Sequence, residues 1–271
     1  MFRTAILAAC LALLLAGLTA ACTTPLDADP SGPPTDSPSG PDRTPGTVSG
    51  TVLDTQGRPL AGARVWIQPS ITTGVVETRT DAGGRYAVSG LPNIPYYAYA
   101  WTEVNYEGER FCLRLAMPGA RDYDSFTPAE GVVRDFRWQL TGPIEDLRQH
   151  DGYFGGEVRL FTEGRFDGRV ELVFAPTGPL VDGSAPAPFT RELDVNAGVM
   201  VYDVPLGRYE VWAVLVGADG RRTSLRVGTD YADRFEAQTE AASLGFRPSG
   251  SCSQGSGVAR GFLYVNSPYA Y

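Results

Sequence analysis

Few side chains in this 271-residue sequence could carry out covalent chemistry. All 23 basic residues are arginine, which excludes a lysine nucleophile or a Schiff base. His150 is the only histidine, so a zinc site built from two or three histidines is excluded as well. It stands beside Asp151 in a polar segment, and the chain has no Gly-x-Ser-x-Gly nucleophile motif. We therefore expect no catalytic residues, no bound metal and no cofactor.

Two pairs of closely spaced carboxylates are candidates for acid–base pairs or calcium ligands. They are Glu107 with Glu109 and Asp122 with Asp124. Neither pair follows the ligand spacing of a calcium-binding loop. We expect both pairs to be solvated charges.

A row of aromatic residues in the segment 96–101 is the best candidate for ligand binding. Tyr97, Tyr99 and Trp101 alternate along the chain, so in a strand their rings share one face of the sheet. Aromatic rings on a solvated sheet can pack against the flat apolar faces of sugars. The alternative is that these rings pack against the second half of the chain or against the loop 118–128.

Cys112 and Cys252 are expected to form a disulfide. Of the other two cysteines, Cys10 lies in the N-terminal apolar segment and Cys22 is a candidate for lipid attachment. Two thiols that remain outside the cytoplasm usually pair. The bridge would join the first folded module to the C-terminal loop 249–257, and the alternative is two separate thiols with Cys112 buried in its strand.

The N-terminus has the pattern of an export signal. A single cation, Arg3, precedes an apolar run over residues 5–15, which is too short to span a bilayer of ~30 Å but suits a signal peptide. The following Leu18-Thr19-Ala20-Ala21-Cys22 resembles the lipobox of bacterial lipoproteins, although its leucine lies four residues before the cysteine instead of three. The resemblance implies a signal peptide over residues 1–21 and a lipid on Cys22. Ordinary cleavage after a small-residue site is the alternative.

Residues 22–45 are expected to form a disordered tether after the lipidated cysteine. They are rich in Pro, Ser, Gly, Thr and Asp and have almost no large apolar residue, so they cannot offset their own ordering entropy. The chain carries a net charge of -8 with a pI of about 4.8. That charge argues against nucleic acid as a partner, and we expect attachment to a membrane through the N-terminal lipid.

Residues 46–141 have the alternating pattern and the turn residues of a β-sandwich. Strands are expected over residues 48–53, 63–68, 75–80, 85–88, 96–103 and 132–140. The motifs that carry a family likeness are Gly50-x-Val52, Asp54-x-x-Gly57-x-Pro59-Leu60-x-Gly62-Ala63-x-Val65, Thr80-Asp81-x-x-Gly84-x-Tyr86 and Leu91-Pro92. With these motifs the segment resembles the carboxypeptidase regulatory-like domain, a transthyretin-like sandwich of seven strands. The resemblance implies no peptidase site, since the family's sandwich has none of its own.

After a linker over residues 142–152, residues 153–271 repeat several of these features. Aligning Pro205 with Pro92 matches Tyr209, Val211 and Ala213 with Tyr96, Ala98 and Ala100. The shared alternation places these residues inward, which leaves Tyr97, Tyr99 and Trp101 on the outer face. Thr190-Arg191 is matched in the same way with Thr78-Arg79. The predicted fold class is all-β, with two Ig-like or transthyretin-like sandwiches after the signal peptide and the Pro-rich tether.

These expectations predict a non-catalytic lipoprotein of the cell envelope, exposed outside the cytoplasm, whose sandwiches have a structural or protein-interaction role. A carbohydrate-binding lipoprotein that uses the three aromatic rings is the alternative. The partner would be a cell-envelope protein in the first case and a polysaccharide in the second. Exposure or burial of the rings distinguishes the two.

Overall fold

The computed structural model describes residues 43–163, 166–195, 200–229, 239–250, 252 and 259–266. The chain divides into two units, residues 1–39 and 40–271, and all the described residues belong to the second. The predicted signal peptide, the lipidation site Cys22 and nearly all of the predicted tether lie outside the described residues.

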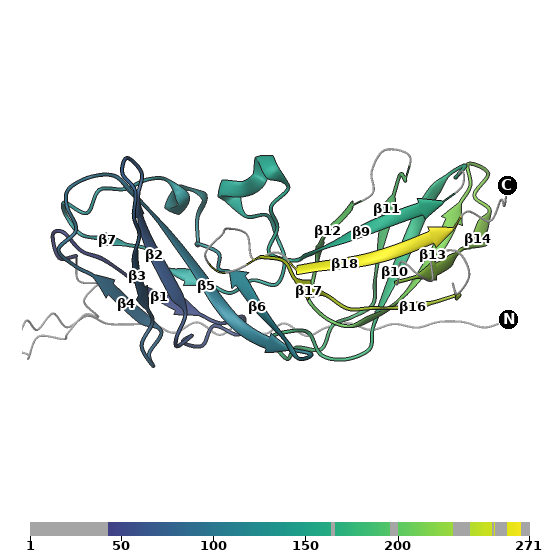
Figure 1. The fold of residues 1–271 in the computed structure, drawn as a ribbon, viewed down its shortest axis with the longest axis horizontal. Coiled ribbons are helices and arrows are strands. Elements are labelled where there is room, and N and C mark those ends of the chain that lie inside the picture. The colour runs from purple at the N-terminus through teal and green to yellow at the C-terminus, as the bar shows by residue number, and fades with distance from the viewer. Residues whose placement is uncertain are drawn as a thin grey trace, which may run out of the picture. The chain divides into compact units, whose positions relative to one another are not determined.

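The first half of the second unit folds into two four-stranded sheets (Figure 1). One sheet has the order β4-β1-β7, with β8 also pairing with β1, and the other has the order β3-β2-β5-β6. Strands β7 and β8 run parallel to β1, and the other pairs are antiparallel. The strands are β1 Val48–Leu53, β2 Arg64–Pro69, β3 Val76–Arg79, β4 Arg85–Val88, β5 Tyr96–Tyr106, β6 Glu109–Arg114, β7 Val132–Val133 and β8 Phe136–Arg137. The single last strand predicted over 132–140 is therefore two short strands.

Turn residues fix the path of the chain after β1. The Asp54 carboxylate accepts hydrogen bonds from the backbone N–H groups of Gln56 and Arg58, at 2.9 and 2.8 Å. Gly57 has φ +79°, a conformation that favours glycine. This Asp-x-x-Gly turn is the predicted one, and it returns the chain towards β2.

Inward-facing residues of the two sheets form the core of the first sandwich. Val65 and Ile67 of β2 lie opposite Ala100 and Ala98 of β5, and all four are at most 3% exposed. Tyr96 is 2% exposed. The period-2 alternation therefore placed the buried face of β5 correctly, because side chains of successive strand residues point to opposite sides.

The second half forms two further sheets, each with five strands. One has the order β11-β10-β13-β14, with β16 also pairing with β13, and the other has the order β12-β9-β18-β15, with β17 also pairing with β18. Strand β18 lies beside β9 and runs parallel to it (Figure 1). The strands are β9 Gly156–Glu163, β10 Arg169–Pro176, β11 Phe189–Leu193, β12 Met200–Val204, β13 Tyr209–Val216, β14 Arg222–Ser224, β15 Arg226–Gly228, β16 Ala242–Leu244, β17 Arg247–Pro248 and β18 Ala259–Asn266.

The two sandwiches share their strand order and pairing. Strands β1 to β6 correspond in sequence to β9 to β14, and β18 takes the parallel position beside β9 that β7 and β8 take beside β1. The register agrees as well, since Tyr96 pairs with Pro69 and Tyr209 pairs with Pro176. The predicted match of Thr78 with Thr190 is off by one residue, because Val65 pairs with Thr78 while its counterpart Leu172 pairs with Arg191.

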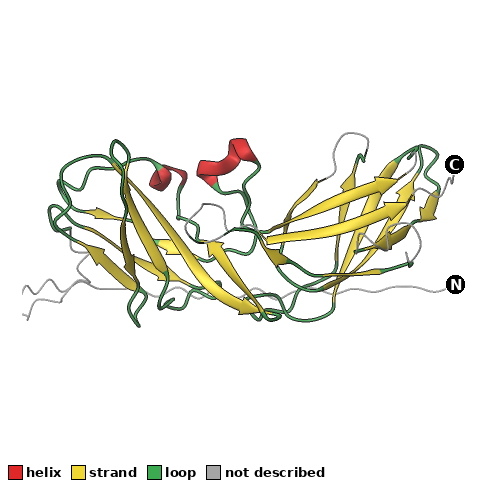
Figure 2. Ribbon diagram, in the orientation of Figure 1, coloured by secondary structure: helices red, strands yellow, loops and turns green. Residues whose placement is uncertain are grey.

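The all-β fold class is confirmed. Strands make up nearly all the regular structure of the described residues, and the two helices are the short 3-10 turns η1 Ala120–Tyr123 and η2 Glu145–His150 (Figure 2). Turn η2 lies within the predicted linker, where Ile144 is fully buried and packs with Ala116 and Phe154. Within the described ranges, no helix has the length and apolar character needed to cross a membrane.

Candidate functional site

The predicted aromatic row lies on the outer face of β5, but one of its three rings is not exposed. Trp101 is 2% exposed and meets Trp66 of β2 edge-on, with ring centroids 4.9 Å apart. Tyr97 and Tyr99 are half-buried and their ring planes differ by 21° at a centroid distance of 6.3 Å. The hypothesis of an exposed three-ring platform is therefore wrong for Trp101, whose ring is buried as the packing alternative predicts.

An arginine and the linker cover this face. The Arg114 guanidinium lies 4.6 Å from the centre of the Tyr99 ring and 5.3 Å from that of Trp101. Arg114 is 5% exposed, and its Nη2 donates a hydrogen bond of 3.0 Å to the Asp146 carboxylate in η2. Burial raises the pKa of Tyr99, and the nearby Asp146 carboxylate raises it further. Neither of the two covers considered from the sequence, the second module or the loop 118–128, supplies this ion pair.

A disulfide joins the two sandwiches. Cys112 of β6 is bonded to Cys252 across 140 residues of chain, with a Cα–Cα distance of 5.3 Å. Further contacts connect the same two sandwiches: the Tyr106 hydroxyl donates to the Pro179 carbonyl at 2.8 Å, and the Thr55 hydroxyl donates to the Asp182 carboxylate at 2.7 Å.

One carboxylate closes the linker between the sandwiches. Asp203, at the end of β12, accepts hydrogen bonds from the backbone N–H of Gly142 at 2.8 Å and of Gly155 at 3.2 Å. Its φ of +61° is uncommon for a residue other than glycine, and its two partners flank the segment between the sandwiches. The linker is therefore a closed loop on the second sandwich.

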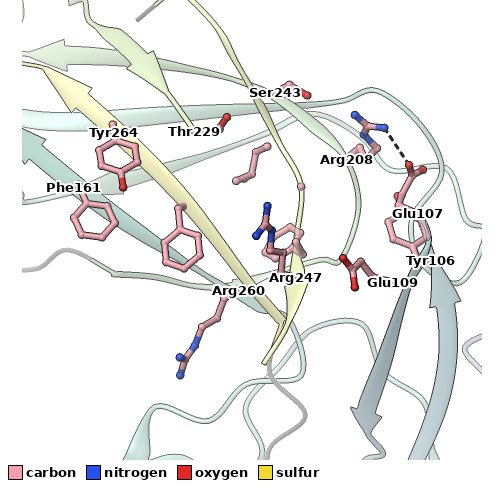
Figure 3. A pocket seen from close by; sticks show the side chains of 14 residues that line it. Tyr106, Glu107, Glu109, Phe161, Arg208, Thr229, Ser243, Arg247, Arg260 and Tyr264 are labelled. Atoms are coloured by element: carbon pink, nitrogen blue, oxygen red, sulfur yellow. Dashed lines mark hydrogen bonds and ion pairs between the residues drawn. The ribbon is translucent and has the colours of Figure 1, made fainter. Parts of the chain in front are cut away.

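Residues of both sandwiches line a cleft of about 670 Å³. The β5–β6 hairpin of the first sandwich contributes Tyr106, Glu107 and Glu109. The second sandwich contributes the outer face of β9 and β18 and the segment around β16 and β17. Figure 3 shows the ion pair of Glu107 and Arg208 on one side of the cleft and the rings of Phe161 and Tyr264 on the other.

Three aromatic rings stack along the floor of the cleft. The ring centroid of Phe161 in β9 lies 4.8 Å from that of Tyr264 in β18, and the two ring planes differ by 12°. The Phe262 ring, also in β18, lies 6.3 Å from that of Phe161, with planes 24° apart. Tyr264 is 6% exposed, whereas Phe262 is 38% exposed. Phe262 is thus the exposed ring of the stack, beside the half-buried Phe161 and the buried Tyr264.

Arginines lie beside this stack and on the other side of the cleft. Arg260 lies 3.5 Å from Glu157, and Arg208 lies 3.0 Å from Glu107. Arg159 sits over the Phe161 ring at 5.3 Å, and Arg247 is exposed at the cleft. In the described part of the chain, neither Arg159 nor Arg247 forms an ion pair with a carboxylate.

Sequence reasoning missed this second group of aromatic residues. The signal was present in the alternation of Arg260, Phe262 and Tyr264, which resembles that of Tyr97, Tyr99 and Trp101. What the sequence does not reveal is that β18 pairs in parallel with β9, which brings Phe161 beside Tyr264 across about 100 residues of chain. In the described ranges, no group of three or more His, Cys, Asp or Glu side chains could hold a metal ion.

Comparison with known families identifies part of the first sandwich. Residues 47–115 match the model of the carboxypeptidase regulatory-like domain, as the motifs predicted. The match spans β1 to β6 and ends before β7 and β8. No curated protein matches the chain.

Three of the solved structures that match this chain have low similarity to it. The Bacillus anthracis TIE protein is 10% identical with a TM-score of 0.32, and the alignment covers 82% of this chain and 34% of that one, so this chain spans about a third of its length. GBS52, the minor pilin of Streptococcus agalactiae, is 11% identical with a TM-score of 0.24, covering 83% of this chain and 97% of the pilin. BcpA, the major pilin subunit of Bacillus cereus, is 11% identical with a TM-score of 0.23, covering 82% and 99%. Likeness at this level carries no argument about function.

Proposed function

We propose that this chain is a non-catalytic lipoprotein of the cell envelope, in which a lipid on Cys22 holds two connected β-sandwiches outside the cytoplasm for a structural or protein-interaction role. The observation that carries the proposal is the disulfide between Cys112 and Cys252. Disulfides form and persist in oxidising compartments, so the bond supports export of the chain. It also restrains the sandwiches relative to each other, which a spacer unit requires.

The sequence before the first sandwich supports the same proposal. A membrane-proximal lipid, an extended Pro-rich segment over residues 23–45 and then a folded unit would hold the sandwiches at a distance from the membrane. The net charge of -8 disfavours adsorption to anionic head groups, so attachment would depend on the lipid.

Metabolic labelling tests the proposed anchor. The full chain, expressed in a bacterium and supplied with radioactive palmitate, should incorporate label and sediment with the membranes. Cys22→Ala should abolish both, while the matched variant Cys10→Ala should change neither. Label that persists in Cys22→Ala, or a wild-type chain that is released unlabelled into the medium, would reject the lipoprotein assignment.

The structure does not favour the alternative of a carbohydrate-binding site on β5. A three-ring platform needs Trp101 to be accessible, and its ring is buried under Arg114. The two half-buried tyrosines that remain, Tyr97 and Tyr99, offer a smaller surface. We therefore do not propose this face as a sugar site.

A further inference from the structure

We propose that the cleft between the sandwiches binds a carboxylate-bearing oligosaccharide, with a sugar ring on Phe262, one carboxylate on Arg247 in the cleft and another on Arg159, which lies outside the cleft lining and opposite Phe262 in the β9–β18 ladder. The proposal is independent of the structural role and of the lipid anchor. It concerns the outer face of β9 and β18, which no match to a known family covers.

The aromatic stack is suited to hold a sugar ring. Phe262 is one of four exposed large hydrophobic residues in the described part of the chain, and the only one of the four that lines the cleft. Phe161 stacks beside it, and Tyr264 stacks on Phe161 in turn, so neighbouring rings restrain the Phe262 ring. A ring that is already ordered loses little side-chain entropy on binding, so its contact area contributes more fully to affinity.

The charges beside Phe262 select for an anion. In the β9–β18 ladder Phe262 lies directly opposite Arg159, and Arg260 lies directly opposite Arg247 on β17. Alternation along β18 places Arg260 on the same outer face as Phe262. Arg159, Arg247 and Arg260 thus share the outer face with Phe262 in a chain whose net charge is -8, and Glu157 pairs with Arg260 at 3.5 Å, which leaves Arg159 and Arg247 as the two cations for a ligand. Arginine binds a planar carboxylate through two parallel hydrogen bonds, and a ligand carboxylate would relieve the repulsion among these cations.

The opposite wall favours a sugar over a uniformly charged polyanion. Glu107 and Glu109 project from the β5–β6 hairpin into the same cleft, and Glu107 is held there by Arg208. Carboxylates repel phosphate groups but accept hydrogen bonds from hydroxyl groups. A ligand that presents carboxylates to one wall and hydroxyls to the other is a uronic-acid oligosaccharide.

Calorimetric titration of the full chain with tetragalacturonate tests the proposal, with maltotetraose as the neutral sugar of equal length. Tetragalacturonate should bind and maltotetraose should not. Arg247→Gln and Phe262→Ala should each weaken binding about tenfold, because each removes one of the two kinds of contact. Arg221→Gln, whose side chain is 79% exposed in the β13–β14 turn and lies outside the cleft lining, is the matched control and should bind as the wild type does.

Several results would overturn the proposal. They are an absence of heat with tetragalacturonate, equal affinity for maltotetraose, or unchanged affinity in both cleft variants. A tetraglutamate peptide that binds as tightly as tetragalacturonate would assign the cleft to acidic peptides instead. The melting temperature of each variant separates loss of binding from loss of fold. If Phe262→Ala has a lowered melting temperature, Arg247→Gln still tests the proposal, because it alters an exposed side chain.

Discussion

At the scale of single residues, Trp101 belongs to the folded interior and not to a ligand-binding surface. Its ring lies between Trp66 and the Arg114 guanidinium at 2% exposure. Trp101→Ala should lower the free energy of unfolding by about 3–5 kcal/mol, since it leaves a cavity and removes the ring below a buried cation. Urea denaturation followed by circular dichroism measures this loss.

The half-buried Tyr97 is the matched control for Trp101, because it lies on the same face of β5. Tyr97→Ala should lower the free energy of unfolding by no more than about 1.5 kcal/mol. Equal and small effects for both variants would mean that the tryptophan ring is accessible after all.

Glu171 gives the stability of the second sandwich an acid dependence. Its carboxylate accepts two parallel hydrogen bonds from Arg222, at 3.0 and 2.6 Å, and these bonds lower the pKa of Glu171 below its ordinary value of 4.5. A carboxylate whose pKa is lower in the folded state contributes stability above its unfolded pKa and loses it as the pH falls through the folded pKa.

Glu171→Gln should therefore melt below the wild type at neutral pH and approach it between about pH 5 and pH 3. Melting temperatures over that range measure the difference. Glu192→Gln, on the neighbouring strand β11 with a side chain 58% exposed, should change the melting temperature little because exposed charges are screened. A constant gap between Glu171→Gln and the wild type down to pH 3 would contradict the role of the charge.

For strand β5, the sequence predicts which residues face inward but not whether the opposite face is exposed. Alternation correctly placed Tyr96, Ala98 and Ala100 inward, because strand periodicity is a local property. Exposure of the opposite face is not local. It depends on Asp146, which lies 45 residues after Trp101 in a segment that reads as a polar linker.

At the scale of the strand, Gly50 allows two segments to meet. A Cβ atom at this position of β1 would lie 2.0 Å from the carbonyl oxygen of Arg134, between β7 and β8. The same oxygen accepts a hydrogen bond of 2.6 Å from the Tyr86 hydroxyl. Gly50→Ala should therefore displace this crossing and lower the free energy of unfolding by at least about 2 kcal/mol.

Gly178→Ala is the control for Gly50→Ala. A Cβ atom there would meet nothing within 4 Å, and the residue does not have a positive φ. The substitution should leave the free energy of unfolding nearly unchanged, or raise it slightly because alanine lowers the conformational entropy of the unfolded chain. If chemical denaturation gave the same midpoint for both variants, the close approach at Gly50 would not constrain the fold.

The repeated topology was partly accessible from the sequence. Both first strands contain a glycine that permits a close approach, and a Cβ atom at Gly156 of β9 would lie 2.5 Å from the Phe246 ring. The two glycines do not hold the same register position, because Val48 pairs with Val88 whereas Val158 pairs with Val201. Matching Tyr96 with Tyr209 gave the correct register for β5 and β13. The match of Thr78-Arg79 with Thr190-Arg191 was displaced by one residue. The two segments share the residue types Thr-Arg, but these residues hold different positions in the two ladders. The shared pairing makes the second sandwich similar in topology to the first.

At the scale of the whole described unit, the connection between the sandwiches combines one covalent bond with several exposed polar contacts. The Arg208–Glu107 pair is half-exposed on both sides, with side chains 50% and 49% accessible. Pairs of this kind contribute about 0–1 kcal/mol. The disulfide closes a loop of 140 residues and restricts the unfolded chain far more strongly.

The double variant Cys112→Ser with Cys252→Ser should therefore lower the free energy of unfolding by up to about 5 kcal/mol, through the loop entropy that the unfolded chain regains. Wild-type protein with reductant should approach the same midpoint. Glu107→Gln is the matched control at the same junction and should lose less than about 1 kcal/mol. Because the bond joins the two sandwiches, the double variant should also become susceptible to limited proteolysis between them, within residues 142–152. A variant as stable and as resistant to protease as the wild type would mean that the polar contacts suffice to hold the sandwiches together, and the disulfide would no longer support the proposed structural role.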